Sequence, residues 1–415
     1  MQVDIHLIKP HPVQARVLAE AQRNNILACG RRWGKTELLK DVAINSYLLE
    51  GLPVGWWFPT YKMLADVWRD LVSTLRPAIR SKNESELRLE LITGGVLDMW
   101  SLDSADTARG RHYALAIVDE AAMVPNILST WNLVIRPMLI DLQGSLWMAS
   151  TPNRDSGLGF KQLYLTAKAG EPGWRAWSSS SYDNPHLPKQ ELDGLRATMT
   201  EEAYRQEILG EFIEGEGAVF RGIAAACNAP KDDKPTNHQG HTLVAGVDWG
   251  KQNDYTVLSV GCKQCAREVA LERYNQIDYE FQAGRVQQLA HAWGIRHMLV
   301  ELNSIGQPMF ERLLRAGLPA SGFDTTATSK PPLIEGLALA IEQGTPQLMG
   351  LEWATAELEA YERKVNSNTG HPTYSAPDGM HDDSVMARAL MVRALAFQPR
   401  LNRPVASPLA GMRNL

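Results

Sequence analysis

The sequence has few cysteines, no long hydrophobic run and no secretory pattern at its start. Four cysteines in 415 residues are too few for a disulfide framework, so the sequence predicts a protein of a reducing cytoplasm. Apolar runs such as Tyr113–Val118 stop at carboxylates, well short of the ~20 residues of a membrane span. The first residues mix Asp4, His6 and Lys9 with apolar ones, which a signal peptide does not do.

Positive charge is not in excess either. The formal net charge of −5 argues against a large basic surface, although local patches could still hold nucleic acid briefly and without sequence preference. The composition, 44% hydrophobic and 21% charged residues, is that of a globular protein. Since 415 residues exceed the usual size of a single core, two domains are expected.

The first half alternates apolar runs with helical stretches, which predicts an α/β domain with a mainly parallel sheet. The expected strands are Ile26–Cys29, Val54–Phe58, Leu115–Val118 and Leu146–Ala149. Each leads into a Gly, Pro, Thr or acidic loop, and ligands of open parallel sheets bind beyond such carboxyl ends. We expect this domain to span residues 1–227, with a linker subdomain at about 178–227 that contains a helix near Glu201–Leu209.

The second half is organised differently. Residues 228–240 are polar and hold two prolines, so we place the linker between domains there. The second domain, residues 241–398, opens with the expected strands Thr242–Val247, Thr256–Gly261 and Glu268–Asn275 and then alternates helix and strand. Residues 399–415 contain proline, glycine and basic residues and are expected to form a flexible tail.

The strongest local signal is the run Cys29-Gly-Arg-Arg-Trp-Gly-Lys-Thr36 between an expected strand and helix. This is the context of a P-loop, whose backbone N–H groups and helix N-terminus hold phosphates. Gly30 and Gly34 would line the nucleotide, Lys35 would reach the β- and γ-phosphates of ATP, and Thr36 would ligate Mg²⁺. Cys29 stands where the motif has its first glycine, so a plain turn that caps a helix is the alternative.

A second signal is Ala114-Leu-Ala-Ile-Val-Asp-Glu120, an apolar run that ends in two carboxylates. A buried strand delivers a magnesium-holding aspartate to the γ-phosphate in this way, which is the role expected of Asp119. Glu120 could then polarise the attacking water as general base. Such a run alone is an ordinary strand end, but behind a P-loop it favours a nucleotide site.

Three weaker features agree with that site. Gln14 lies shortly before the loop, where helicase-like motors place an adenine-reading glutamine, and Ser150 and Thr151 follow the next strand, where a γ-phosphate sensor would lie. Arg109 precedes the Asp-Glu strand and could serve as an arginine finger within one subunit or across two. Each is otherwise a surface or turn residue.

Acidic residues stand at element boundaries in the second half. They are Asp248 and Glu301 at the ends of expected strands, and Asp382 and Asp383 at the start of a helix. Two-metal cleavage of phosphodiesters needs carboxylates that converge from separate elements, and oxygen ligands suit Mg²⁺ or Mn²⁺. Any one of these acids could merely cap a helix or end a surface strand, but their order, with Asp254 in the first hairpin, predicts a ribonuclease-H-like sheet.

Two further sets of residues, a cysteine pair and a group of basic residues, are interpreted as having no functional role. Cys262-Lys-Gln-Cys265 suggests half of a zinc site, but a structural zinc needs four ligands and no second pair lies nearby in the sequence. We therefore expect two cross-strand neighbours and no zinc. The basic residues Arg76, Arg80 and Lys82 are interpreted as a solvated helix face.

With these residues assembled, the chain resembles the large terminase subunit of tailed bacteriophages over nearly its whole length. The matching parts are Gln14, Gly30–Thr36, Val118–Ala121, Ser150–Pro152, Tyr204–Phe212, Asp248, Glu301 and His381–Asp383. Arg31 matches a loop arginine that is thought to respond to the γ-phosphate in the family. Glu301 stands where many relatives have aspartate, and either carboxylate can hold a metal.

The resemblance implies a P-loop ATPase domain followed by a ribonuclease-H-like nuclease domain. It implies a packaging motor that uses ATP to move double-stranded DNA into a procapsid and that cuts concatemeric DNA with metal ions. It also implies a ring, commonly of five subunits, on the portal protein, and a small terminase subunit that selects DNA in the cytoplasm of the infected host. Which of Asp382 and Asp383 is the principal ligand stays open.

Two rival interpretations remain. A helicase-like ATPase of DNA repair would normally carry a second motor lobe where this chain has the acidic pattern. A non-catalytic structural protein, for instance a decayed prophage copy retained as a scaffold, would not be expected to retain Lys35, Asp119, Glu120 and the acids of the second half.

Overall fold

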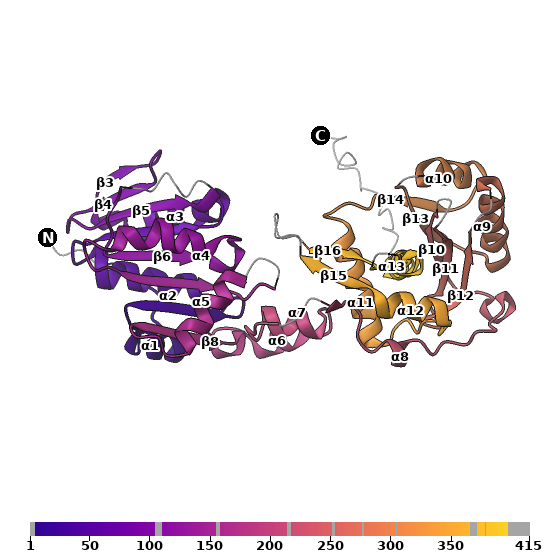
Figure 1. Ribbon diagram of the computed structural model, residues 1–415, viewed down its shortest axis with the longest axis horizontal. Helices are drawn as coiled ribbons and strands as arrows, with labels where there is room; N and C mark the ends of the chain where they lie inside the picture. Colours follow the sequence, from indigo (N-terminus) through magenta and orange to yellow (C-terminus); the bar gives the residue numbers. More distant parts are fainter. Residues whose placement is uncertain are drawn as a thin grey trace, which may run out of the picture. The chain divides into compact units, whose positions relative to one another are not determined.

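The computed structural model of the chain describes residues 5–103, 110–154, 158–213, 217–250, 254–275, 278–303, 305–365, 372–377 and 379–396. It divides into unit 1, Met1–Glu216 with Lys364–Pro372, and unit 2, Gly217–Arg363 with Thr373–Leu415 (Figure 1). Arg109 and the tail expected at 399–415 lie outside the described residues.

The break between the units comes earlier than the expected linker at 228–240. That segment is polar, but its polar groups bond within unit 2. Ala229 N donates to Leu348 O at 2.9 Å, and the carboxylate of Asp233 accepts from Arg267 Nη2 at 2.8 Å. Composition alone therefore misplaced the boundary, because the partners of these residues lie far along the chain.

Unit 1 is built on an eight-stranded sheet in the order β3-β4-β5-β2-β6-β7-β1-β8. The strands from β5 to β8 in that order run parallel, and β3 and β4 add an antiparallel edge. The bounds are β1 (Asn24–Cys29), β2 (Pro53–Phe58), β3 (Ile79–Asn83), β4 (Arg88–Leu91), β5 (Val96–Ser101), β6 (Leu115–Asp119), β7 (Ser145–Ser150) and β8 (Trp174–Ser179). The mainly parallel sheet and its predicted strands are confirmed.

The central strands are buried on both faces, as covered parallel sheets require. On β6, Leu115 and Ile117 face one apolar layer and Ala116 and Val118 face the other, because side chains alternate along a strand. The helices of unit 1 are α1 (Pro12–Ala19), α2 (Lys35–Ala43), α3 (Tyr61–Leu75), α4 (Ile127–Thr130), α5 (Leu158–Lys168), α6 (Lys189–Leu195) and α7 (Glu201–Glu207).

The helix expected over Arg80 and Lys82 is wrong. Both residues lie on the edge strand β3, which pairs with β4 as an antiparallel hairpin. Arg80 and Lys82 are exposed there, and their charges are paired with Glu90 and Glu84. Charged side chains on an edge strand oppose pairing with other chains.

Unit 2 contains a five-stranded sheet in the order β12-β11-β10-β13-β14. The first three strands are antiparallel, and β10, β13 and β14 run parallel, which confirms the predicted second α/β domain. The strands are β10 (Leu243–Asp248), β11 (Thr256–Cys262), β12 (Arg267–Tyr274), β13 (His297–Glu301) and β14 (Ala320–Phe323). A small sheet is formed by β9 (Gly217–Ala218), β15 (Glu362–Val365) and β16 (Pro372–Ser375).

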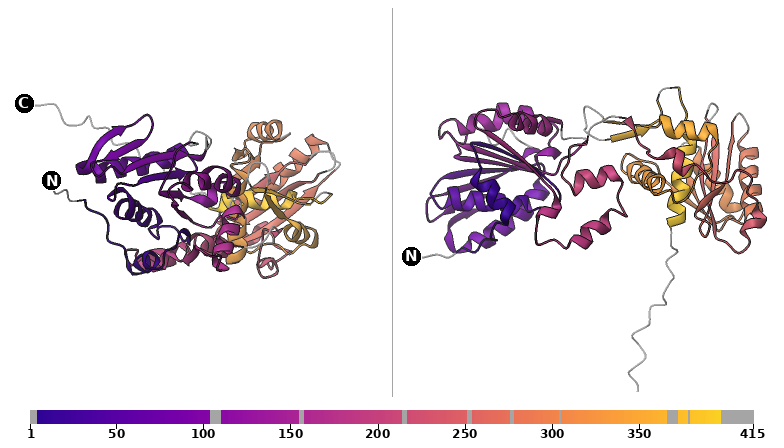
Figure 2. Two further views of the ribbon diagram at one scale, coloured as in Figure 1. Left: turned by 60° about the vertical axis from the view of Figure 1, so that its left-hand side comes forward. Right: turned by 90° about the horizontal axis from the view of Figure 1, so that it is seen from below.

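Helices cover both faces of the five-stranded sheet. They are α8 (Ile223–Ala226), α9 (Tyr279–Trp293), α10 (Gly306–Arg315), α11 (Lys330–Gln343), α12 (Glu352–Ala360) and α13 (Asp383–Ala396). The last of them, α13, lies directly against β10 and is the yellow helix of Figure 2. A Cβ on Gly246 of β10 would lie 2.0 Å from Ala387 O of α13, so this close approach requires glycine.

A buried ion pair fixes α13 further. Arg388 of α13 and Glu268 of β12 are both 0% exposed, and Arg388 Nη2 donates to Glu268 Oε2 at 2.9 Å. Arg388 also donates to the carbonyl oxygens of Met349 and Ala354 at 2.7 and 3.3 Å. The pair therefore ties the helix to the sheet and to the segment before α12.

None of the helices in the described parts of the chain combines the length and apolarity that crossing a bilayer would take.

Candidate functional sites

The loop between β1 and α2 places the ammonium group of Lys35 among oxygen acceptors. Lys35 Nζ lies 3.3 Å from Cys29 O, 3.2 Å from Gly30 O and 2.8 Å from Thr151 Oγ1. The side chain is buried, yet it has three acceptors whose positions phosphate oxygens could take. Thr151 comes from the end of β7, the neighbour of β1, so the predicted sensor and the predicted P-loop lysine do meet.

Backbone conformation and Gln14 define the shape of the loop. Gly34, just before α2, has φ of 100°, a left-handed conformation that favours glycine. Gln14 Nε2 donates to Gly34 O at 2.9 Å, and Gln14 Oε1 accepts from His11 N at 3.0 Å. Gln14 is thus a buried support of the loop.

Thr36 and Asp119 form an oxygen pair at the start of α2. Thr36 Oγ1 donates to Asp119 Oδ2 at 2.7 Å. Burial, and next the charge of Glu120, raise the pKa of Asp119 to about 6. A hydroxyl and a carboxylate of this kind are hard oxygen ligands, the donor set that Mg²⁺ prefers, so the residues fit the predicted ion.

Glu120 is held in an unusual conformation beside this pair. Its φ is 52°, which is strained for a residue other than glycine and is found where function demands it. Ser150 Oγ donates to Glu120 Oε2 at 3.1 Å. Because β6, β7 and β1 are neighbours in the sheet, their carboxyl ends bring Asp119, Glu120 and Ser150 to the P-loop.

The P-loop also contacts the segment that follows β8, which sequence reasoning missed. A Cβ on Gly30 would lie 2.3 Å from Ile208 O and 2.6 Å from Ser181 Oγ. Arg31 N donates to Glu207 O at 2.7 Å, and the 70% exposed side chain of Arg31 forms an ion pair with that of Glu207. No motif signals these contacts; only the requirement for glycine at position 30 hints at them.

In unit 2, Asp248 and Glu301 end the adjacent parallel strands β10 and β13. Burial raises the pKa of Asp248 well above its usual value, and a hydrogen bond with Glu301 raises it further. The charges of Glu301, Asp383 and Asp382 act in the same direction. The four predicted acids therefore face a common region at the carboxyl edge of the sheet.

The two aspartates at the start of α13 differ in their surroundings. Asp383 is buried, and its Oδ2 accepts from Tyr255 N at 3.1 Å. Burial raises its pKa to about 7, although the hydrogen bond from Tyr255 opposes the rise. Asp382 is only half-buried, and its Oδ2 lies 3.6 Å from Lys330 Nζ.

The acids fit divalent cations bound through oxygen. Asp248, Glu301 and Asp383 are carboxylates crowded in a poorly solvated region, and such groups remain ionised together only when cations offset their repulsion. Among the described residues, their oxygens do not form a group that lies wholly within 4.8 Å. Asp254, the weakest of the predicted acids, lies on the same side, with Oδ1 3.9 Å from His381 Nδ1.

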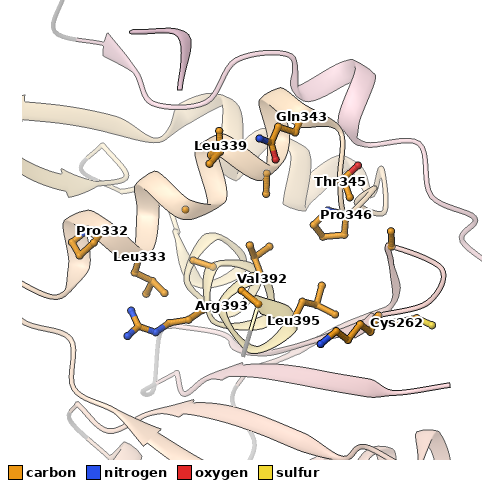
Figure 3. Close-up of a pocket in the computed structure, with 16 residues that line it drawn as sticks. Cys262, Pro332, Leu333, Leu339, Gln343, Thr345, Pro346, Val392, Arg393 and Leu395 are labelled. Atoms are coloured by element: carbon orange, nitrogen blue, oxygen red, sulfur yellow. The ribbon is translucent and has the colours of Figure 1, made fainter. Parts of the chain in front are cut away.

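A cavity of about 510 Å³ lies elsewhere in unit 2, between α11, α13 and the β11–β12 turn. Figure 3 shows its mainly apolar lining, with Leu333, Leu339 and Val392 directed toward it. None of the acids lines it. It is therefore separate from the predicted nuclease site.

The expectation that Cys262 and Cys265 are cross-strand neighbours is wrong, because Cys262 pairs with Arg267 and Cys265 lies in the turn between β11 and β12. The structure brings His238 and His241 to these cysteines, and the ligand atoms of all four residues lie within 4.8 Å of one another. The two histidines were missed because His238 falls in the segment interpreted as a linker, residues 228–240, and His241 directly follows it. Their own close spacing, matched by that of the cysteines, was the available signal.

Comparisons with known proteins find similarity to phage terminases. A family model described as the N-terminal part of the terminase large subunit, T4likevirus-type, matches residues 26–225. The large terminase subunit of Thermus virus P23-45 is 24% identical over 426 residues, which cover 92% of this chain and 87% of that protein. That of Escherichia phage T5 is 25% identical over 253 residues, covering 59% and 57% of the two chains.

A solved structure agrees with the fold. The structure of a large terminase from a thermophilic bacteriophage matches with a TM-score of 0.55 at 16% identity, over 93% of this chain and 99% of that one. This likeness extends across both units. The chain is therefore similar to the large terminase subunits of bacteriophages over most of its length.

Proposed function

We propose that this chain is a DNA-packaging motor that hydrolyses ATP in unit 1 and cuts DNA in unit 2. The observation that carries the proposal is the convergence of Lys35, Thr36, Asp119 and Glu120 at the carboxyl ends of three neighbouring parallel strands. A helicase-like enzyme would share this half, but the acids of unit 2 and the similarity to large terminase subunits favour a terminase.

Each residue of unit 1 has a chemical role in this proposal. Lys35 neutralises the β- and γ-phosphate oxygens of ATP, and Thr36 with Asp119 holds Mg²⁺, which supplies further positive charge during phosphoryl transfer. Glu120 accepts a proton from the attacking water. Ser150 orients Glu120 through the hydrogen bond between them, and Thr151 contacts Lys35 where it would respond to loss of the γ-phosphate.

Movement would follow from the contacts between the P-loop and the segment after β8. Arg31 N is bonded to Glu207 O of α7, and the two side chains are paired. The guanidinium of Arg31 contacts the carboxylate of Glu207 and is otherwise largely exposed. A γ-phosphate can therefore compete with Glu207 for the guanidinium. Hydrolysis would then shift Arg31 and with it α7, which couples the nucleotide to the linker subdomain.

In unit 2, Asp248, Glu301 and Asp383 would hold two Mg²⁺ or Mn²⁺ ions, and such ions would supply the activation of water and the charge stabilisation that cleavage of the DNA backbone needs. We assign Asp383 rather than Asp382 as the principal ligand from α13. Asp383 is buried and its charge acts more strongly on Asp248 than that of Asp382 does, whereas Asp382 lies beside the positive charge of Lys330.

The partners follow from the family. They are double-stranded DNA, the portal protein of the procapsid, the small terminase subunit and further copies of this chain in a ring of five, in the cytoplasm of the infected host. Cutting of concatemeric DNA belongs to the same proposal. Arg109 would complete the ATP site from its own or a neighbouring subunit.

The nucleotide half is tested by ATP hydrolysis. We expect Lys35→Ala to lose ATP binding and Glu120→Gln to keep binding but lose hydrolysis, because only the proton acceptor is removed. Lys62→Ala, which removes an exposed lysine of α3, is the matched control and should hydrolyse ATP as the wild type does. Hydrolysis that survives both site variants would overturn the assignment.

The metal half is tested by calorimetric titration with Mn²⁺. Asp248→Ala should lose binding. Asp324→Ala, which removes an exposed carboxylate just after β14, should keep it. Equal binding by the two variants would show that the ions sit elsewhere.

A further inference from the structure

Four potential metal ligands meet at the edge of unit 2 away from the acids. Cys262 ends β11, and Cys265 lies in the turn that leads to β12. His238 ends the short 3-10 helix Pro235–His238, and His241 precedes β10. The two histidines lie more than 20 residues before the two cysteines in the sequence. The β11–β12 hairpin and the segment before β10 bring the four residues together.

The distances within this cluster are those of a metal site. Nδ1 of His241 lies 3.3 Å from Cys262 Sγ and 3.4 Å from Cys265 Sγ, and Nδ1 of His238 lies 3.6 Å from Cys265 Sγ. A tetrahedral zinc with bonds of ~2.3 Å to sulfur and ~2.05 Å to nitrogen places those two atoms about 3.6 Å apart. The observed spacings therefore leave room for one ion at the centre.

The surroundings of His238 select the ring nitrogen that faces the cluster. His238 is buried, and its Nε2 lies 3.0 Å from Asp233 Oδ2. Asp233 is held in turn by Arg267 and Asn237. The negative charge of Asp233 favours a proton on Nε2, although the contact lacks the alignment of a hydrogen bond. The lone pair of Nδ1 then remains for a metal, and a carboxylate in this position is a common support of a zinc-bound histidine.

We infer that His238, His241, Cys262 and Cys265 bind one Zn²⁺ ion in a closed structural site. Two thiolates and two imidazoles suit zinc and not the hard cations expected at the nuclease acids. Four protein ligands leave no open position for water or substrate, so the ion serves structure and not catalysis. The zinc ion would link the polar segment before β10 to the β11–β12 turn. This link explains why that segment belongs to unit 2.

The site is tested by metal analysis of the full chain purified without chelators or a histidine tag. We expect close to one zinc per chain in the wild type and near none in Cys265→Ser, with circular dichroism as a check on folding. Cys227→Ser removes a free cysteine outside the cluster and should keep its zinc. Asp248→Ala should keep it too, so the result does not depend on the proposed nuclease.

Cobalt substitution tests the same ligands in the unaltered protein, should the serine variant fail to fold. Co²⁺ in the wild type should show the intense visible bands of a tetrahedral ion and a thiolate charge-transfer band. The proposal fails if the wild type holds no zinc and gives no thiolate band. It also fails if Cys265→Ser keeps full zinc content, or if protein purified under anaerobic conditions contains a Cys262–Cys265 disulfide.

Discussion

Replacing Arg388 by methionine should destabilise unit 2 by about 3–5 kcal/mol, because a buried carboxylate would lose its countercharge. Glu268 accepts from Arg388 Nε and Nη2 at 3.2 and 2.9 Å, from Ser259 Oγ at 2.7 Å and from Met349 N at 2.8 Å. The substitution removes the two charged donors and leaves the two neutral ones. Methionine fills much of the same volume, so a cavity adds little.

Equilibrium unfolding in guanidinium, followed by circular dichroism and tryptophan fluorescence, measures this loss. The matched control is the double variant Glu268→Gln/Arg388→Met. Its neutral amide needs no countercharge, and its carbonyl oxygen can accept from Met349 N while its NH2 group donates to Ser259 Oγ, so most of the lost stability should return. A loss below about 1 kcal/mol in the single variant, or a double variant no more stable than the single one, would refute the reasoning.

Three other outcomes are expected. Gly30→Ala should lower ATP hydrolysis by more than about tenfold, since its Cβ would lie 2.3 Å from a backbone carbonyl oxygen, whereas Gly194→Ala, with nothing within 4 Å, should not. Ser150→Ala should lower kcat for ATP with little change in KM, because it frees Glu120 without touching the phosphates; a change confined to KM would argue against this role. With the pKa of Asp383 raised to about 7, protons compete with metal below that pH, so calorimetry should show Mn²⁺ affinity falling from pH 8 to pH 6, and a flat profile would contradict the assignment.

The raised pKa of Asp383 also makes the stability of the folded protein depend on pH. Because the folded state raises the pKa of Asp383 from 3.8 to about 7, the metal-free protein favours the protonated carboxyl. Its contribution to stability is present at low pH and is lost as pH rises from about 4 through about 7. Added Mn²⁺ should restore stability above pH 7, which thermal unfolding with and without the ion measures.

The sequence predicted the parts of the sites that lie at strand ends. The run from Leu115 to Val118 is apolar throughout because it is buried on both faces, and that pattern marks where the apolar part of the strand stops and its carboxylates begin. Asp248 and Glu301 were found in the same way. Parallel strands end at one edge of a sheet, so strand ends alone bring such residues together.

Contacts between distant segments could not be predicted in this way. Nothing in the local pattern of Ser181 or Ile208 indicates that they lie against Gly30. His238 and His241 sit in a polar segment whose composition is that of a linker, and only the return of the chain onto the β11–β12 turn gives them partners. The segment that carries Arg80 was predicted as a helix face and is an edge strand. Its extended conformation depends on pairing with β4, which its own sequence does not indicate.

The central claim, two separate active sites in one chain, is tested most directly by plasmid cleavage with Mg²⁺ or Mn²⁺ and ATP hydrolysis in the same preparations. The wild type should do both, Asp248→Ala should hydrolyse ATP without cutting, and Lys35→Ala should cut without hydrolysing ATP. Cleavage by Asp248→Ala at the wild-type level would contradict the account of unit 2 and leave only the nucleotide site standing.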